Sequence, residues 1–169
     1  ARRFALYKRA ALLLRDLEKA ERLFADPERP VQIIFAGKPH PEDPNGRELF
    51  ETISRLSRMR QFAGRVVLLE NYDIEVCRHL VQGVDIWLNN PRRPQEASGT
   101  SGQKVPVNGG LNVSILDGWW CEGYAPTTGW AFGKARRYQD PELQDREDGA
   151  DLYRVLRREV VPLYYRRGR

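Results

Sequence analysis

The chain is poor in the residues that build metal sites and disulfide frameworks. Its 169 residues include two cysteines and two histidines. Cys77 and Cys121 are too few for a disulfide framework and lack the spacing of metal ligands, while His40 and His79 stand alone. The sequence therefore predicts neither a bound metal ion nor a disulfide-stabilised scaffold.

Long apolar runs are missing too. No stretch of about 18 apolar residues occurs, so we expect no membrane-spanning helix and no membrane partner. The first residues do not resemble a secretory leader, and we therefore expect a cytoplasmic protein. The chain opens on "ARRFALYKRA", without an initiator methionine and already within a helical pattern, so we expect a piece of a longer polypeptide.

A continuous basic stripe is absent as well. The 28 Lys and Arg exceed the 23 Asp and Glu, which gives a net charge of +5. Many arginines lie in acid-rich stretches such as "LLLRDLEKAERLF", whereas nucleic-acid-binding domains gather their basic residues on one face. We interpret these charges as solvated helix surfaces and expect no nucleic-acid partner.

What the sequence does contain is a regular exchange of strand-like and helical patterns. Short runs rich in β-branched residues predict three buried strands, "VQIIFAGK" (31–38), "RVVLLEN" (65–71) and "DIWLNN" (85–90). Helical spacing covers residues 4–25, 47–62 and 73–84. Strands that alternate with helices form βαβ units. The sequence thus predicts an α/β fold with a doubly wound, Rossmann-like parallel sheet, in which residues 1–169 form a single domain.

The last third of the chain is less regular. "LNVSILDG" (111–118) and "GWAFG" (129–133) predict further strands. "YQDPELQDREDGA" (138–150) predicts a polar connection, and "ADLYRVLRREVVPLYY" (150–165) predicts a final helix with an interruption at Pro162.

A loop rich in small residues, "EASGTSGQKVPVNGG" (96–110), follows the third strand. Ligands of doubly wound sheets bind at the carboxyl ends of strands. Gly99 and Gly102 let the backbone approach an anion, and Thr100 and Ser101 add donors. Because Pro106 is tolerated only near a helix start, the helix is predicted to begin near Ser101 or Gly102.

Lys104 then falls in the first helical turn, in surroundings that we expect to be sheltered. The helix dipole disfavours a charged amine there, and a neutral amine is what bond formation to a carbonyl group requires. A structural turn with Lys104 in solvent fits the local pattern equally well. The loop is neither a P-loop nor a dinucleotide-binding fingerprint.

Several stretches together resemble a known family. "EASGTSGQK" followed by "NGGLNVSILDGWW" resembles the segment around the cofactor lysine of the α-glucan (glycogen or maltodextrin) phosphorylases. "RRFALYKR" resembles their phosphate-site motif, and "IIFAGKPHP", "VVLLENYD" and "GVDIWLNNPRRPQEASGTSG" are similar to the same family. The resemblance implies the C-terminal half of a two-domain GT-B architecture, with the N-terminal domain absent from this chain.

The resemblance also implies a chemistry. In this family pyridoxal 5′-phosphate is held as a Schiff base by the lysine matching Lys104, and its phosphate takes part in acid–base transfer. The reaction is reversible phosphorolysis of terminal α-1,4-linked glucose to glucose 1-phosphate with retained configuration. The partners implied are the glucan, inorganic phosphate, the missing N-terminal domain and a second subunit of a homodimer.

Site residues follow from the same resemblance. The basic residues expected to hold phosphates and act in catalysis are Arg2, Arg3 and Lys8, and four-residue spacing predicts Arg3 and Tyr7 on one helix face. The residues expected to hold the cofactor are Lys104, Thr100, Ser101 and Tyr72. Those expected to hold glucosyl hydroxyls are Glu96, Ser98 and Gly99.

Other interpretations stay open beside these. Arg2, Arg3 and Lys8 also suit an exposed, frayed helix start, and Tyr72 suits simple core packing. Trp119 and Trp120 suit core packing better than a sugar-stacking platform. The whole chain also fits a non-catalytic carbohydrate- or phosphate-binding module, whereas Lys104 argues against a sugar-nucleotide-dependent glycosyltransferase.

Overall fold

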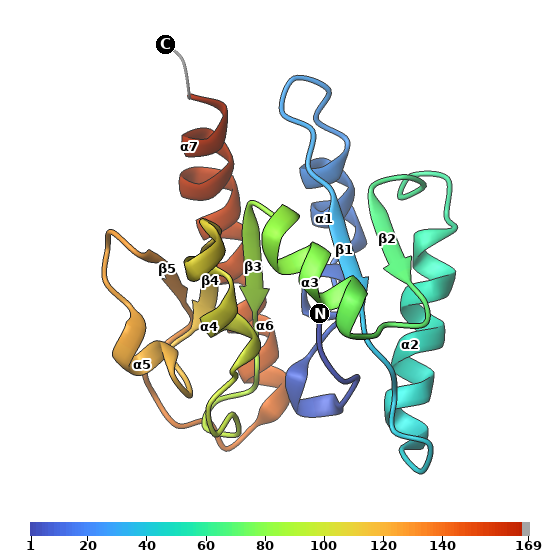
Figure 1. Cartoon of the computed structure of the whole chain (residues 1–169), viewed down its shortest axis with the longest axis horizontal. Coiled ribbons are helices and arrows are strands. Elements are labelled where there is room, and N and C mark those ends of the chain that lie inside the picture. Colours follow the sequence, from blue (N-terminus) through green and yellow to red (C-terminus); the bar gives the residue numbers. More distant parts are fainter. Residues whose placement is uncertain (167–169) are drawn as a thin grey trace.

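The computed structural model describes residues 1–166 and has an α/β architecture (Figure 1). Its strands are β1 (Ile33–Ala36), β2 (Val66–Leu69), β3 (Ile86–Asn89), β4 (Leu111–Ile115) and β5 (Gly129–Phe132). Its α-helices are α1 (Leu17–Phe24), α2 (Pro44–Ser57), α3 (Ile74–Gly83), α4 (Ser101–Lys104), α5 (Trp120–Gly123), α6 (Pro141–Val155) and α7 (Val161–Tyr165). Short 3₁₀ segments are η1 (Leu6–Lys8), η2 (Leu12–Leu14) and η3 (Pro106–Asn108), and η4 (Leu156–Val160) is a π-helical segment.

Each strand pair is parallel, as predicted, but the strands form two sheets rather than one. β1 pairs with β2 from Ile33↔Val66 onward, and β4 lies between β3 and β5. Within the described residues β1 and β3 do not pair, so the expectation of a single continuous sheet is wrong for this chain. A cavity lined by both strands separates them.

Helices lie on both sides of the strands (Figure 1), and buried apolar side chains form two clusters between helices and strands. Val113 and Ile115 of β4 face the larger core, which α1, α2 and α6 complete. Trp87 of β3 faces a smaller cluster that contains Val81 of α3 and Val105 next to α4. Helices on both faces are what the doubly wound pattern predicted.

The first segment departs from the predicted helix over residues 4–25. Phe4 forms a parallel bridge with Pro39, and Arg9 adopts a left-handed conformation with φ of 50°. Only Leu17–Phe24 becomes α-helical, capped by Asp16, whose side chain accepts from the Lys19 N–H. The helix prediction was wrong there because the backbone pairs with β1 and the buried Arg9 breaks the helical path.

Residues 138–150 contain a helix where a polar connection was predicted. Asp140 caps α6, with its carboxylate accepting from the Glu142 N–H at 2.8 Å, and Pro141 occupies the first turn. The inward face carries the buried polar residues Gln144, Asp145 and Asp148, so apolar periodicity is absent from the sequence. The last helix was predicted to be interrupted at Pro162; the structure instead has the π-helical segment η4 up to Val160, and Pro162 lies in the first turn of α7.

The other elements match their predictions closely. The strands predicted at 31–38, 65–71, 85–90, 111–118 and 129–133 all form. α2 begins earlier than predicted because the Asp43 side chain accepts from the Gly46 N–H at 2.9 Å and so caps the helix before Pro44. Among the described residues, every helix is too short or too polar to cross a bilayer.

Candidate functional site

The predicted site residues gather where the strands end. Residues 2–8 pass the carboxyl end of β1, Tyr72 follows β2, and residues 90–104 follow β3. Asp117 comes two residues after β4. Parallel strands bring such segments to a common edge, which is the usual ligand edge of doubly wound folds.

Arg2 is fixed at this edge by the backbone on either side of it. Its N–H donates to Ala36 O at 2.9 Å, and its guanidinium Nη2 donates to Leu88 O. Gly37 permits this approach, since a Cβ there would lie 1.9 Å from Arg2 O. The Nη1 atom of Arg2 is buried without a hydrogen-bond partner, and burial lowers the pKa of this guanidinium to about 10 although Glu96 opposes the shift. A buried cation with an unused donor is a good candidate for binding an anion.

Lys8 and Glu96 form an ion pair beside Arg2. Lys8 Nζ lies 2.9 Å from Glu96 Oε2, and the two side chains are 15% and 7% exposed. The Glu96 N–H donates to Asp117 Oδ2 at 2.9 Å, which fixes the position of this loop. The Lys8 ammonium also lies 5.0 Å from the ring centre of Tyr7.

Arg9 holds this part of the chain in place. Its Nε and Nη2 donate to Asn90 O at 2.9 Å and Pro91 O at 2.7 Å. Its Nη1 donates to Asp145 at 3.0 Å and to Asp148 at 2.8 Å, both on α6. Because Arg9 follows Lys8 directly, this network fixes the backbone next to Lys8.

The small-residue loop ends in α4, and this helix starts at Ser101, as the position of Pro106 predicted. Gly102 is buried against Trp119, and its carbonyl accepts from Asn112 Nδ2 at 3.1 Å. Gly99 has φ of 79°, and a Cβ there would lie 3.4 Å from Asn89 Nδ2. That amide nitrogen of Asn89 is buried and unpaired, so it is a second free donor next to the loop.

Lys104 is exposed rather than sheltered, so that expectation was wrong. Its Nζ donates weakly to Thr100 O at 3.4 Å. The reason is the helical phase: Gly102 and Val105 turn inward, which leaves Lys104 on the outer side of a four-residue helix. Its amine is thus open to approach from outside.

The remaining predicted residues are either half-buried or exposed. Tyr72 is half-buried near Cys77, and burial together with that contact raises the pKa of its hydroxyl. The carbonyl of Ser98 accepts from the Trp119 N–H at 2.9 Å. Arg3 and Thr100 are exposed, and Ser101 is half-buried at the helix start. Arg3 lies outside any helix, so the predicted Arg3–Tyr7 helix face is wrong.

Trp119 and Trp120 serve packing, as the sequence favoured. Trp120 is 1% exposed, and the two rings meet edge to face with centres 5.0 Å apart. Trp119 packs against Gly99 and Gly102 and so supports the loop and α4 from inside.

Sequence reasoning missed four residues at this edge, namely Arg9, Asn89, Asn90 and Asp117. The signal available was positional, since Asn89 and Asn90 end a predicted strand and Asp117 follows another. Buried polar side chains at strand ends are typical of ligand-binding edges. Within residues 1–166, His, Cys, Asp and Glu form no group suited to a metal ion.

Comparison with known proteins assigns the class. Residues 1–124 match the model of the family described as carbohydrate phosphorylase. This match covers most of the chain, and the chain belongs to that family. The resemblance found in the motifs is therefore confirmed.

The similar proteins are named as phosphorylases of maltodextrin or glycogen. A maltodextrin phosphorylase of Thermococcus litoralis is 50% identical over 165 residues, which are 98% of this chain and 20% of that protein. Glycogen phosphorylases of Aquifex aeolicus and Mycobacterium bovis are 47% and 46% identical over 167 residues, 99% of this chain and 24% and 19% of those proteins. The chain thus spans about a fifth to a quarter of the length of these relatives.

Proposed function

We propose that this chain supplies part of the active site of an α-glucan phosphorylase, which uses inorganic phosphate to release terminal α-1,4-linked glucose as glucose 1-phosphate. The observation that carries the proposal is the meeting of Arg2, the Lys8–Glu96 pair and the loop to Lys104 at one edge of the strands. The relatives, named as phosphorylases of maltodextrin or glycogen, support the same reaction class.

Pyridoxal 5′-phosphate is the cofactor that we propose, and the residues present fit it. Lys104 offers an exposed primary amine to an aldehyde. Ser101 begins α4, so its N–H has no acceptor within the helix, and the Thr100 and Ser101 hydroxyls add donors for a phosphate. When bound, this cofactor supplies a phosphate that can exchange a proton with the substrate phosphate. Tyr72 is proposed to lie near its ring.

The basic residues are proposed to hold the substrate phosphate. Arg2 has a free guanidinium nitrogen, and the Lys8 ammonium has three donors, of which the side-chain carboxylate of Glu96 takes one. Such cations neutralise charge that builds up on the phosphate during transfer. Arg3 is proposed to add a further positive charge from its exposed position.

The glucosyl unit is proposed to bind at the other end of the loop. Glu96 is an acceptor for sugar hydroxyls, with Ser98 and Gly99 beside it. In the forward reaction the bond from glucosyl C1 to the glucan oxygen breaks, C1 bonds to a phosphate oxygen, and that glucan oxygen takes up a proton. The configuration at C1 is retained.

The remainder of the active site lies, in this proposal, on residues outside this chain. We propose that the intact enzyme is a cytoplasmic homodimer of GT-B architecture, in which an N-terminal domain closes the site over the phosphates. Water would otherwise reach the reacting groups. The 169-residue chain alone is therefore expected to release no glucose 1-phosphate, and detection of that product from the pure chain would contradict this expectation.

Cofactor attachment tests the proposal directly. The full-length protein is titrated with pyridoxal 5′-phosphate, reduced with borohydride and mapped by peptide mass. We expect a pyridoxyl adduct on Lys104, and in Lys104→Ala the loss of that adduct together with at least about 1000-fold loss of phosphorolysis. Lys19→Ala, which removes an exposed lysine of α1, is the matched control and should keep both.

The same experiment separates the alternative class. A non-catalytic binding module would hold glucan or phosphate but carry no adduct on Lys104 and form no glucose 1-phosphate. That combination in the full-length protein would overturn the proposal.

A further inference from the structure

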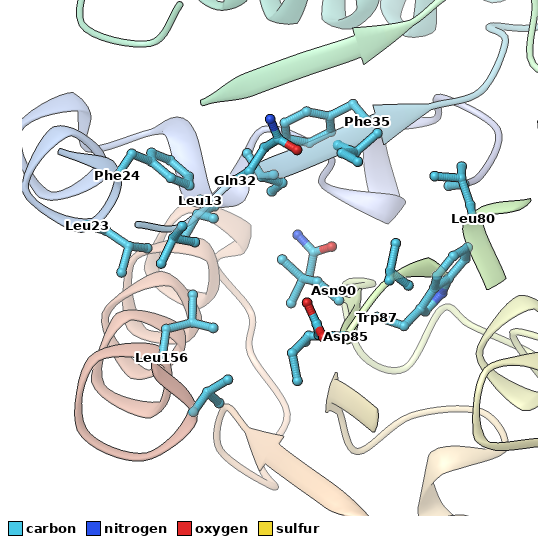
Figure 2. A pocket seen from close by; sticks show the side chains of 18 of the residues that line it. Leu13, Leu23, Phe24, Gln32, Phe35, Leu80, Asp85, Trp87, Asn90 and Leu156 are labelled. Carbon is cyan, nitrogen blue, oxygen red and sulfur yellow. The ribbon is translucent and has the colours of Figure 1, made fainter. Parts of the chain in front are cut away.

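A cavity lies between β1 and β3. Its volume is about 420 Å³, many times the roughly 30 Å³ that one water occupies in the liquid. Figure 2 shows Leu13, Leu23, Phe24 and Leu156 on one side of it and Leu80 and Trp87 on the other. An apolar opening of this size through the middle of a fold leaves much surface unburied.

The two strands turn unpaired edges toward this cavity. The Ile33 N–H donates to Arg65 O at 2.8 Å, on the side of β2. Backbone groups alternate along a strand, so those of Ile34 and Ala36 face the cavity. By the same rule, Asp85 O accepts from the Leu111 N–H on the side of β4, which turns Ile86 and Leu88 toward the cavity.

The first residues of the chain already behave as a strand beside β1. The Arg2 N–H donates to Ala36 O at 2.9 Å, and the Phe4 N–H donates to Lys38 O at 3.3 Å. This two-residue step and the Phe4↔Pro39 bridge define a parallel register. Followed backward from Ala1, the same register leads into the cavity, which Ala1 and Arg2 line at its end.

We propose that the segment directly preceding Ala1 in the same polypeptide fills this cavity as a parallel strand between β1 and β3. The residue before Ala1 then donates to Ile34 O and accepts from the Ala36 N–H, and the opposite edge pairs with Ile86 and Leu88. The two sheets become one. The cavity has apolar walls on both faces, so this strand carries apolar side chains on both faces.

The resulting strand order supports the proposal. With the new strand counted first, the order across the sheet is β2, β1, new strand, β3, β4, β5, or 3-2-1-4-5-6 in chain order. This is a common order of doubly wound sheets, and its topological switch point lies between the first and fourth strands. Arg2 leaves the new strand at that point, next to Leu88 of β3.

Hydrogen exchange in the full-length protein tests the strand. We expect the amides of Ile34, Ala36 and Leu88 to exchange as slowly as that of Val113 in β4. The Leu68 amide faces away from β1 by the same alternation, and it should exchange at least about 100-fold faster than the other four. Exchange at Ile34 and Leu88 as fast as at Leu68 would overturn the proposal.

A second measurement identifies the occupant. A synthetic peptide of the eight residues that precede Ala1 in the full-length protein is added to the 169-residue chain, with the reversed sequence as control. We expect the native peptide alone to raise Tm and slow exchange at Ile34 and Leu88. Equal effects of both peptides, or protection of these amides by dimerisation of the chain, would contradict the proposal. The full-length measurement decides the case if the 169-residue chain does not fold.

Discussion

Two clusters of charged and polar side chains lie at the same end of the strands, and they use their hydrogen-bonding groups differently. Around Arg9, every guanidinium nitrogen has an acceptor, from Asn90, Pro91, Asp145 or Asp148. Around Arg2, one guanidinium nitrogen and the nearby amide nitrogen of Asn89 are buried without partners.

This difference separates structural charge from charge that is free for a ligand. A satisfied buried network rigidifies a fold and is expensive to break. Unpaired buried donors cost stability in the free protein, and an anion that satisfies them recovers that cost. We therefore propose that the Arg9 cluster positions the chain and that the Arg2 cluster binds phosphate.

The largest expected effect is on stability, from Arg9→Met. This change leaves Asp148 without its buried cation, whereas Asp145 keeps its ion pairs with Arg15 and Arg92. Breaking a buried pair such as Arg9–Asp148 costs about 3–5 kcal/mol in the free energy of unfolding. Urea unfolding of the full-length protein measures the loss. Arg22→Met, in an exposed pair with Glu18, is the matched control and should change stability by less than about 0.5 kcal/mol. Equal effects of the two variants would show that the network is not structural.

Arg2→Met should have the opposite effects to Arg9→Met, with a large loss of activity and a small loss of stability. Loss of one preorganised donor to a transferring phosphate costs about 100- to 1000-fold in rate. Unfolding free energy should change by less than about 1 kcal/mol, because the variant also removes an unsatisfied buried nitrogen. kcat/KM for phosphate and urea unfolding of the full-length enzyme measure the two effects.

The exposed Arg78, paired with Glu75 on α3, provides the control for this variant. Arg78→Met should leave kcat/KM for phosphate unchanged. If Arg2→Met destabilises the protein as strongly as Arg9→Met and leaves phosphate kinetics unchanged, the distinction between the two clusters fails.

Gly118→Ala tests the part of the loop that is proposed to hold the glucosyl unit. Gly118 has φ of 55°, and an added Cβ would lie 2.4 Å from Ser98 O. Gly64, with φ of 72° and nothing within 4 Å, isolates the cost of the left-handed backbone. We expect Gly118→Ala to cost about 1–3 kcal/mol more than Gly64→Ala and to raise KM for the glucan in the full-length enzyme, because the Ser98 backbone must move. Equal unfolding free energies would show that the close contact is not rigid.

The fold was predictable where apolar periodicity reports burial. The five strands and α2 and α3 all bury apolar faces, and their positions follow from the sequence. α6 escaped prediction because its inward face is polar and pairs with arginines more than 50 residues away. The division into two sheets escaped prediction because β1 and β3 can belong to one sheet only if another segment lies between them, and the local pattern of each strand does not report its neighbours.

The candidate site was predictable from its local motif and only partly from its surroundings. The start of α4 at Ser101 follows from the position of Pro106. The exposure of Lys104 does not follow from the local motif, because it depends on which side of the four-residue helix α4 faces Trp119. Contacts such as Lys8–Glu96 join residues 88 positions apart, and nothing in the local pattern encodes them.

The smallest expected effect concerns how a buried and an exposed carboxylate respond to pH. Burial raises the pKa of Asp148 above 3.8, an effect that Arg9 partly offsets. The folded state therefore binds the proton of the Asp148 carboxyl group more tightly than the unfolded chain does. The protonated carboxyl group stabilises the folded state below pH 3.8, and this stabilisation is lost as pH rises through the raised pKa. In Asp148→Asn that loss is absent, so the stability advantage of the unmodified protein over the variant should shrink as pH rises from 4 to 7.

Asp16 provides the contrast in sign. Its exposed carboxylate accepts hydrogen bonds from the Lys19 ammonium, which has the larger effect, and from the Lys19 backbone N–H. These hydrogen bonds lower the pKa of Asp16. Its contribution to stability is present above pH 3.8 and is lost on acidification, so the advantage over Asp16→Asn should grow with pH. Urea unfolding of both variants at pH 4, 5, 6 and 7 measures the two slopes. If the stability advantage grows with pH for both residues, Arg9 must outweigh the effect of burial on Asp148. The Arg9 cluster would then behave like an ordinary surface ion pair.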